Sequence, residues 1–153
     1  MEEMLKQAKL KALHLLTDMD RTEEQLRLKL KQKGYTDDVT EQAIQYVKSF
    51  GYINDEKYAM RFIESRQSVK SRYEIYMTLC QKGVNQEIIE KAMDICYESY
   101  SEVETIRNLI EKKKFSPEGS SEAEKKKIYD YFRRKGFRNG DIRQVIQVFE
   151  RNA

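Results

Sequence analysis

A short segment, Lys-Gly followed by an apolar or aromatic residue, occurs three times in this chain. The three copies are the last three residues of the stretches Gln32–Tyr35, Gln81–Val84 and Arg134–Phe137. Their glycines lie 49 and 53 residues apart, and apolar residues keep the same offsets on both sides of each glycine. This register predicts an internal repeat of about 50 residues, built from helices on either side of the segment.

Each Lys-Gly segment predicts the end of a helix. Glycine readily adopts the left-handed conformation that closes many helices, and the lysine before it places positive charge at the negative end of the helix dipole. A Schellman ending also predicts an apolar contact between the residue after the glycine and the residue four before the glycine. The predicted pairs are Tyr35 with Leu30, Val84 with Leu79, and Phe137 with Phe132.

Helix-breaking residues are scarce, since the 153 residues include one proline and six glycines. Charged residues make up 36% and hydrophobic residues 39%, which favours thin helices with large solvated faces over one deep core. Capping patterns start at Thr22, Ser71, Ser101 and Ser121. The predicted fold is all-α, with nine short helices in three tandem three-helix repeats. The repeats cover residues 1–50, 51–99 and 100–153 and form one continuous array that is elongated and can be curved.

A second kind of helix-ending turn separates the first predicted repeat from the second. Gly51 is expected to end a helix, and Tyr52 and Ile53 to fold back as an apolar anchor. Asn54 is placed to cap the helix that follows. The only proline and a nearby glycine predict a loop between residues 112 and 120, which accounts for the longer second repeat interval.

The two cysteines do not suggest a disulfide framework. Cys96 shares its repeat position with Val47 and is predicted to be a core thiol, whereas Cys80 aligns with Lys31 and is predicted to be exposed. The N-terminus lacks the order of a secretion signal, and no apolar run reaches transmembrane length. These features predict a cytoplasmic protein without a membrane partner.

The residues give little support to an enzyme. The single histidine, His14, lies inside a predicted helix without a nearby carboxylate or cysteine partner, and the cysteines lack metal-ligand spacing. No phosphate-binding G-x-x-x-x-G-K-[ST] motif is found. Asp55 and Glu56 could pass for a catalytic pair, but a place in the first turn of a helix explains them better. The chain is predicted to be no enzyme and to use no cofactor and no metal.

Basic residues are concentrated toward the end of the chain. The net charge is +3, while residues 112–153 hold 12 Lys and Arg against 6 Asp and Glu. Candidate binding residues are Arg61, Arg66, Lys70 and Arg72 in the middle, and Arg133, Arg134, Lys135, Arg138 and Arg143 in the last repeat. Tyr73, Tyr129, Tyr131 and Phe137 are interleaved with them. Such a surface can face phosphate or an acidic protein, although a solvated helix face with uneven charge explains the counts equally well.

Taken together, these residues resemble the RecX family of bacterial recombination regulators. The most specific stretch is Gly51–Ala59, similar to that family's Gly-Tyr-Leu-Asp-Asp-x-x-Phe/Tyr-Ala, and Arg133–Phe137 is similar to its Arg-Arg-Gly-Phe segment. The resemblance covers residues 12–149 and includes the three Lys-Gly endings. Asn54 replaces a common Asp, and Val69–Ser71 lacks a glycine that is frequent there.

The resemblance implies binding to the RecA recombinase, chiefly to its filament on single-stranded DNA. It further implies modulation, mostly inhibition, of the ATPase, strand-exchange and coprotease activities in DNA repair, recombination and the SOS response. Single-stranded DNA, and more weakly duplex DNA, are further candidate partners, and a monomer is expected. Two alternatives stay open: a helical-repeat protein that acts by occupying single- or double-stranded DNA, and a helical adaptor with another partner.

Overall fold

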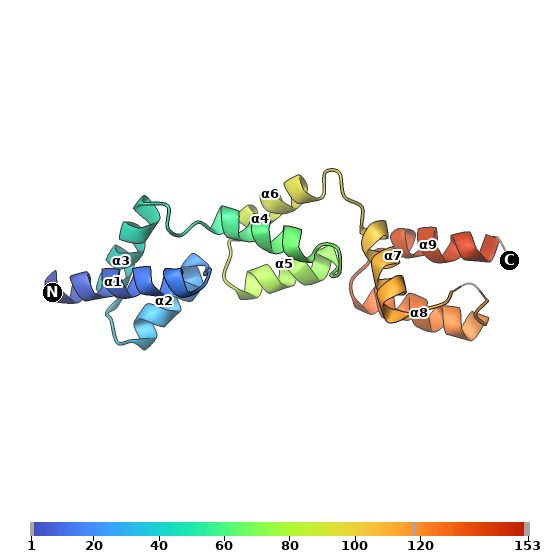
Figure 1. The fold of residues 1–153 in the computed structure, drawn as a ribbon, viewed down its shortest axis with the longest axis horizontal. Coiled ribbons are helices and arrows are strands. Elements are labelled where there is room, and N and C mark those ends of the chain that lie inside the picture. Colours follow the sequence, from blue (N-terminus) through green and yellow to red (C-terminus); the bar gives the residue numbers. More distant parts are fainter. Residues whose placement is uncertain (1, 118, 152–153) are drawn as a thin grey trace. The chain divides into compact units, whose positions relative to one another are not determined.

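The computed structural model describes residues 2–117 and 119–151, and it describes side chains through Ile146. Over these residues the chain forms nine α-helices and no strand. Figure 1 shows the order of the helices along the chain. The helices are α1 (Glu2–Asp18), α2 (Glu23–Gln32), α3 (Asp37–Ser49), α4 (Asp55–Arg66), α5 (Arg72–Gln81), α6 (Gln86–Cys96), α7 (Glu102–Lys113), α8 (Glu122–Arg134) and α9 (Asn139–Arg151). The prediction of nine short helices is therefore confirmed.

The helices begin at the predicted capping residues, because their side chains satisfy backbone N–H groups that have no partner inside the helix. The Thr22 hydroxyl accepts the backbone N–H of Gln25 at 3.1 Å, and the Gln25 side chain accepts the N–H of Thr22 at 3.1 Å. Ser71 and Glu74 form the same reciprocal pair at the start of α5. Asn54 caps α4 as predicted.

The three Lys-Gly segments end helices as predicted. Gly34, Gly83 and Gly136 all have positive φ angles, of 96°, 85° and 93°. The residue after each glycine donates its backbone N–H to the carbonyl five residues earlier. These bonds join Tyr35 to Leu30 (3.3 Å), Val84 to Leu79 (3.1 Å) and Phe137 to Phe132 (3.2 Å). They are the Schellman hydrogen bonds that the Lys-Gly pattern predicts.

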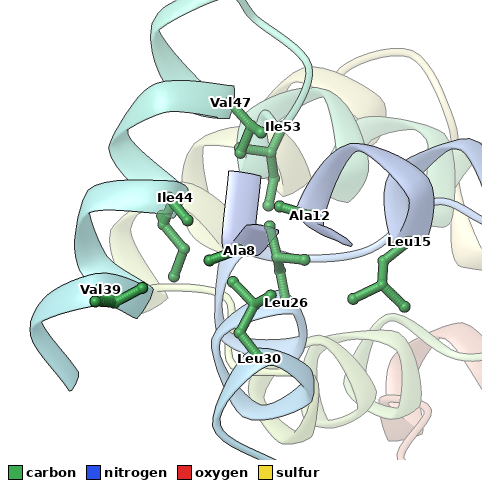
Figure 2. Packing of buried hydrophobic residues seen from close by; sticks show 10 residues of the cluster. Ala8, Ala12, Leu15, Leu26, Leu30, Val39, Ile44, Val47 and Ile53 are labelled. Atoms are coloured by element: carbon green, nitrogen blue, oxygen red, sulfur yellow. The ribbon is translucent and has the colours of Figure 1, made fainter. Parts of the chain in front are cut away.

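The first three helices enclose a small apolar core. Helix α1 packs against α3 and α2, and Figure 2 shows the side chains of Ala8, Ala12, Leu26, Ile44 and Val47 gathered in the space between them. The two alanines on α1 are fully buried, and their small side chains allow the helix axes to approach closely. The buried set is Ala8, Ala12, Leu15, Leu26, Leu30, Val39, Ala43, Ile44, Val47 and Ile53.

The turn at Gly51 differs from its prediction in one residue. Ile53 is buried with the first core, as expected, but the Tyr52 side chain is 57% exposed. Tyr52 stacks on Phe50, which is 59% exposed, with ring centroids 5.7 Å apart. The prediction that Tyr52 anchors the turn was therefore wrong, because only one of two successive side chains faces the core.

The cysteines agree with their prediction in part. Cys80 is exposed, as expected, whereas Cys96 is only half-buried. Cys96 is the last residue of α6, so its side chain lies at the edge of the packed helices rather than within them. Burial raises the pKa of the Cys96 thiol, and the negative charge of Glu64 adds to that effect.

The chain divides into two compact units, which are Met1–Arg61 with Leu79–Lys91, and Phe62–Thr78 with Ala92–Ala153. Each unit contains one complete outer set of three helices and a part of the middle set, so the repeat boundaries and the elongated shape stay predictions. The core of the second unit includes Val103, Ile106, Leu109, Ile128, Phe132, Phe137, Ile142, Val145 and Ile146. Phe132 is fully buried at its centre and meets the Phe137 ring edge-on.

Within the first unit, the start of α2 contacts the Lys-Gly segment that ends α5. The Thr22 hydroxyl donates a hydrogen bond to the Lys82 backbone carbonyl at 2.6 Å. The Glu23 backbone N–H donates to Asp55 Oδ1 at 2.9 Å, and Thr22 is fully buried. We call this set of contacts the first joint; its residues are Thr22, Glu23, Glu24, Asp55, Lys82 and Gly83.

Within the second unit, equivalent residues repeat these contacts. The Ser71 hydroxyl donates to the Lys135 carbonyl at 2.5 Å, and the Arg72 backbone N–H donates to Glu102 Oε2 at 3.0 Å. Ser71, like Thr22, is fully buried. We call this set the second joint; its residues are Ser71, Arg72, Tyr73, Glu102, Lys135 and Gly136.

Candidate partner-binding surface

Three of the candidate arginines are exposed on the last two helices. Arg133 and Arg134 lie in the last turn of α8, and Arg143 lies in α9. Each is exposed, and none has a salt bridge within the described part of the chain. Their charge is therefore available to a partner. We call these three residues the basic surface.

Arg72, Lys135 and Arg138 instead surround the second joint. The Arg72 guanidinium lies 3.7 Å from Asp94, and Lys135 Nζ lies 4.0 Å from Glu74. Burial raises the pKa of Glu102; its hydrogen bond from the Arg72 backbone N–H and the nearby positive charges of Arg138 and Arg72 oppose that rise. Arg72 and Lys135 therefore belong to the structure of the joint, a role that the charge pattern did not reveal. Arg138 is exposed and has no salt bridge among the described residues, although its charge acts on Glu102.

The remaining candidates lie on or after α4. Arg61 pairs with Asp20 at 3.3 Å, so its charge is partly neutralised within the first unit. The Arg66 guanidinium lies 3.8 Å from the centroid of the Phe62 ring, a cation–π contact. Lys70 is exposed in the turn before α5 and has no salt bridge among the described residues. The charge of Lys70, like the charges of the basic surface, is therefore available to a partner.

Most of the interleaved aromatic residues are unavailable for stacking on a nucleic-acid base. Phe137 is buried, and Tyr129 and Tyr131 pack against the second core. Tyr73 is 57% exposed, and it lies beside the backbone of Gly136. A strand-binding surface needs several exposed rings, and these four positions supply one.

The first joint borders an acidic cleft that the sequence analysis missed. Its volume is about 610 Å³, and its lining includes four acidic residues and two basic ones, which are Glu23, Glu24, Asp55, Glu56, Arg27 and Lys48. Lys48 Nζ lies 3.0 Å from Glu23 Oε1. Burial raises the pKa of Asp55, and the charge of Glu23 adds to that effect, whereas the hydrogen bond from the Glu23 backbone N–H lowers it. The equivalent repeat positions of Thr22 and Ser71, which the capping patterns contain, could have revealed the joints but not this cleft.

Arg27 neutralises part of this acidic region. Its guanidinium donates to both carboxylate oxygens of Glu41, at 2.5 and 3.0 Å, and to Glu24 at 2.6 Å and Glu23 at 3.2 Å. The hydrogen bond to Glu41 is the largest cause of the raised pKa of Arg27. The same bond lowers the pKa of Glu41. Arg27 therefore ties α2 to α3 beside the cleft.

Within residues 2–117 and 119–151, no three His, Cys, Asp or Glu side chains are grouped so that they could hold a metal ion. Across the same part of the chain, no helix has the length and apolar character needed to cross a membrane.

The chain matches three family models in the order expected of a tandem array. They describe the first three-helix domain of RecX over residues 8–46, the second over 54–93 and the third over 100–146. The predicted succession of three three-helix repeats is therefore confirmed.

Similar sequences and structures agree with this match. A regulatory protein RecX from Caldanaerobacter subterraneus subsp. tengcongensis is 39% identical over 144 residues, covering 94% of this chain and 71% of the relative. One from Trichlorobacter lovleyi is 31% identical over 142 residues, covering 90% and 92%. The crystal structure of RecX from Lactobacillus salivarius has a TM-score of 0.82 at 23% identity, covering 98% of this chain and 99% of that one. By these domain matches and relatives, the chain belongs to the RecX family of regulatory proteins.

Proposed function

We propose that this protein binds the filament that a RecA-type recombinase forms on single-stranded DNA and regulates its activities in the cytoplasm. The expected effect is mostly inhibition of ATPase, strand exchange and coprotease activity. The observation that carries the proposal is the ordered match of three RecX three-helix domains across residues 8–146. The relatives named regulatory protein RecX support it.

The basic surface is the part of the molecule that we propose contacts the filament. Arg133, Arg134 and Arg143 are exposed without salt bridges within the described chain, so binding an acidic surface would not require breaking internal ion pairs. Charges of this kind steer association and favour partners of opposite sign. Several weak contacts from successive repeats would strengthen one another through effective concentration.

The decisive experiment is a titration of recombinase ATPase activity on single-stranded DNA with this protein. The rate should fall in a saturable way, at ratios of regulator to recombinase well below one if filaments are capped and near one if they are coated. Bovine serum albumin at the same concentrations is the control. An unchanged rate at a regulator excess would contradict the proposal.

A second candidate function is occupation of DNA itself. The excess of 12 Lys and Arg over 6 Asp and Glu in residues 112–153 favours it. Binding that depends on phosphate contacts falls steeply with rising salt. A pull-down of nucleotide-bound recombinase with and without DNA, at low and high salt, separates the two. Capture without DNA, or capture on DNA that survives high salt, requires contact with the recombinase itself, whereas capture through occupied DNA needs DNA and falls with salt.

A further inference from the structure

The two joints are built from residues at equivalent positions of successive repeats. In both, the hydroxyl residue that caps a repeat's second helix donates to the carbonyl of the lysine in the next Lys-Gly segment. These bonds span 60 residues for Thr22 and 64 residues for Ser71. A long-range contact that recurs at equivalent positions is a feature of the repeat and not an accident of one loop.

A carboxylate completes each joint. Asp55 and Glu102 are the first residues of α4 and α7, and each accepts a backbone N–H from the first turn of the preceding repeat's second helix. Each carboxylate therefore lies between the N-terminal ends of two helices, where the helix dipoles favour negative charge. The facing charges are Glu23, Lys48 and Arg27 around Asp55, and Asp141, Arg138 and Arg72 around Glu102.

The third capping residue serves as an internal comparison. Ser121 starts α8 as Thr22 starts α2, and its hydroxyl accepts the backbone N–H of Glu124 at 3.2 Å. Ser121 is exposed, whereas Thr22 and Ser71 are fully buried. Ser121 therefore only caps its own helix, whereas Thr22 and Ser71 cap their helices and also bond to the next repeat.

We propose that Thr22 and Ser71 are positioning residues for partner binding, because each holds the Lys-Gly end of the next repeat at a fixed place. This inference rests on the proposed function. If successive repeats contact successive subunits of a filament, two repeats can bind at the same time only when the spacing between them is fixed. A loosened joint spreads the repeats over many spacings and lowers the effective concentration of the second contact once the first has formed.

The substitution Thr22→Asp separates the two roles of the cap. Aspartate accepts the backbone N–H of Gln25, as threonine does, so it preserves the start of α2. An ionised aspartate has no proton to donate to the Lys82 carbonyl, and its negative charge repels that oxygen. Ser71→Asp makes the same change at the second joint. Ser121→Asp is the matched control, because it adds the same charge to a cap that has no joint, and Thr22→Ser keeps both roles.

The structural readout is the distance between two spin labels across the first joint. One label is attached to native Cys80, which is exposed near the end of α5, and the other to Asp38→Cys, in a Cys96→Ser background. Thr22→Asp should broaden the distance distribution, while Ser121→Asp and Thr22→Ser should leave it unchanged. An unchanged distribution in a folded Thr22→Asp protein would overturn the inference. If Thr22→Asp fails to fold, the same comparison is made with Ser71→Asp and labels across the second joint.

The functional readout is inhibition of recombinase ATPase by the same variants. Thr22→Asp and Ser71→Asp should need at least about tenfold more protein for half-inhibition, as expected when linked contacts lose effective concentration. Ser121→Asp should match the unmodified protein. A broadened distribution with unchanged inhibition would overturn the positioning role. If the unmodified protein does not inhibit at all, the proposed function fails, and with it the positioning role, while the label distances still test the joint.

Discussion

Gly136 lies directly against Tyr73, so closely that a Cβ atom at Gly136 would stand 2.7 Å from the Tyr73 Cβ. In the first joint, a Cβ atom at Gly83 would stand 2.4 Å from the Glu24 Cβ. A Cβ atom at Gly34 would meet no atom within 4 Å. All three glycines have positive φ, but only two of them also allow a close approach of the preceding repeat.

Alanine substitutions at two of these glycines should therefore have unequal costs. Gly34→Ala should lower the free energy of unfolding by about 1 kcal/mol, the cost of left-handed strain alone. Gly83→Ala should cost about 1–3 kcal/mol more, because the added methyl group overlaps the Glu24 side chain. Urea denaturation followed by circular dichroism measures both. Equal costs at the two positions would mean that the first joint does not form in solution.

The substitution Asp55→Asn should change how stability depends on pH. Burial raises the folded-state pKa of Asp55 above its ordinary value of 3.8. A carboxyl group with a raised folded-state pKa contributes stability below its unfolded pKa and loses that contribution as the pH rises through the folded pKa. Asparagine keeps an oxygen for the Glu23 N–H but does not ionise. The stability of Asp55→Asn relative to the unmodified protein should therefore increase as the pH rises upward from 3.8.

Denaturation at a series of pH values measures this difference. Glu56→Gln is the control for charge removal, because Glu56 is the exposed neighbour of Asp55 in the same helical turn. A difference between Asp55→Asn and the unmodified protein that shrinks with rising pH would contradict the assignment of Asp55 as a half-buried carboxylate with a raised pKa.

Removal of the Arg27 guanidinium should destabilise the first unit. Arg27→Ala leaves Glu23, Glu24 and Glu41 near one another without their shared cation, and should cost about 1–3 kcal/mol, as for lost charged hydrogen bonds. Thermal unfolding at low and high salt measures this loss, which should shrink as salt screens the repulsion between the carboxylates. Lys29→Ala on the same helix is the control, and an equal effect of the two variants would show that the Arg27 network adds nothing.

Reversal of the basic surface should weaken regulation without unfolding the protein. The triple variant Arg133→Glu, Arg134→Glu and Arg143→Glu should need about tenfold more protein for half-inhibition of recombinase ATPase, because like charges on both surfaces oppose association. Arg138 is left unchanged because its positive charge acts on Glu102 in the second joint. Lys6→Glu, Lys29→Glu and Lys57→Glu together form a control with the same change in charge. Full inhibition by a folded triple variant would exclude the basic surface as a binding site.

The sequence by itself determined the helices and the way they start and stop. The Schellman bond from Tyr35 to Leu30 and the capping box of Thr22 and Gln25 join residues at most five positions apart. Such local contacts depend on residue type and spacing, so a repeated pattern predicts them. Family membership was also within reach, because Gly51–Ala59 and the three Lys-Gly endings keep their order along the chain.

Only the tertiary structure decided which of these local features contact distant residues. Thr22, Ser71 and Ser121 are hydroxyl caps of the same kind, yet only the first two are buried and bonded to another repeat. The tertiary structure likewise decided which arginines are paired within the chain. Arg72 lies beside Asp94, whereas Arg133 is exposed without an ion pair among the described residues. A cap or a charge has the same chemistry wherever it occurs. Its role depends on the group that folding brings against it, and that neighbour is as many as 64 residues away.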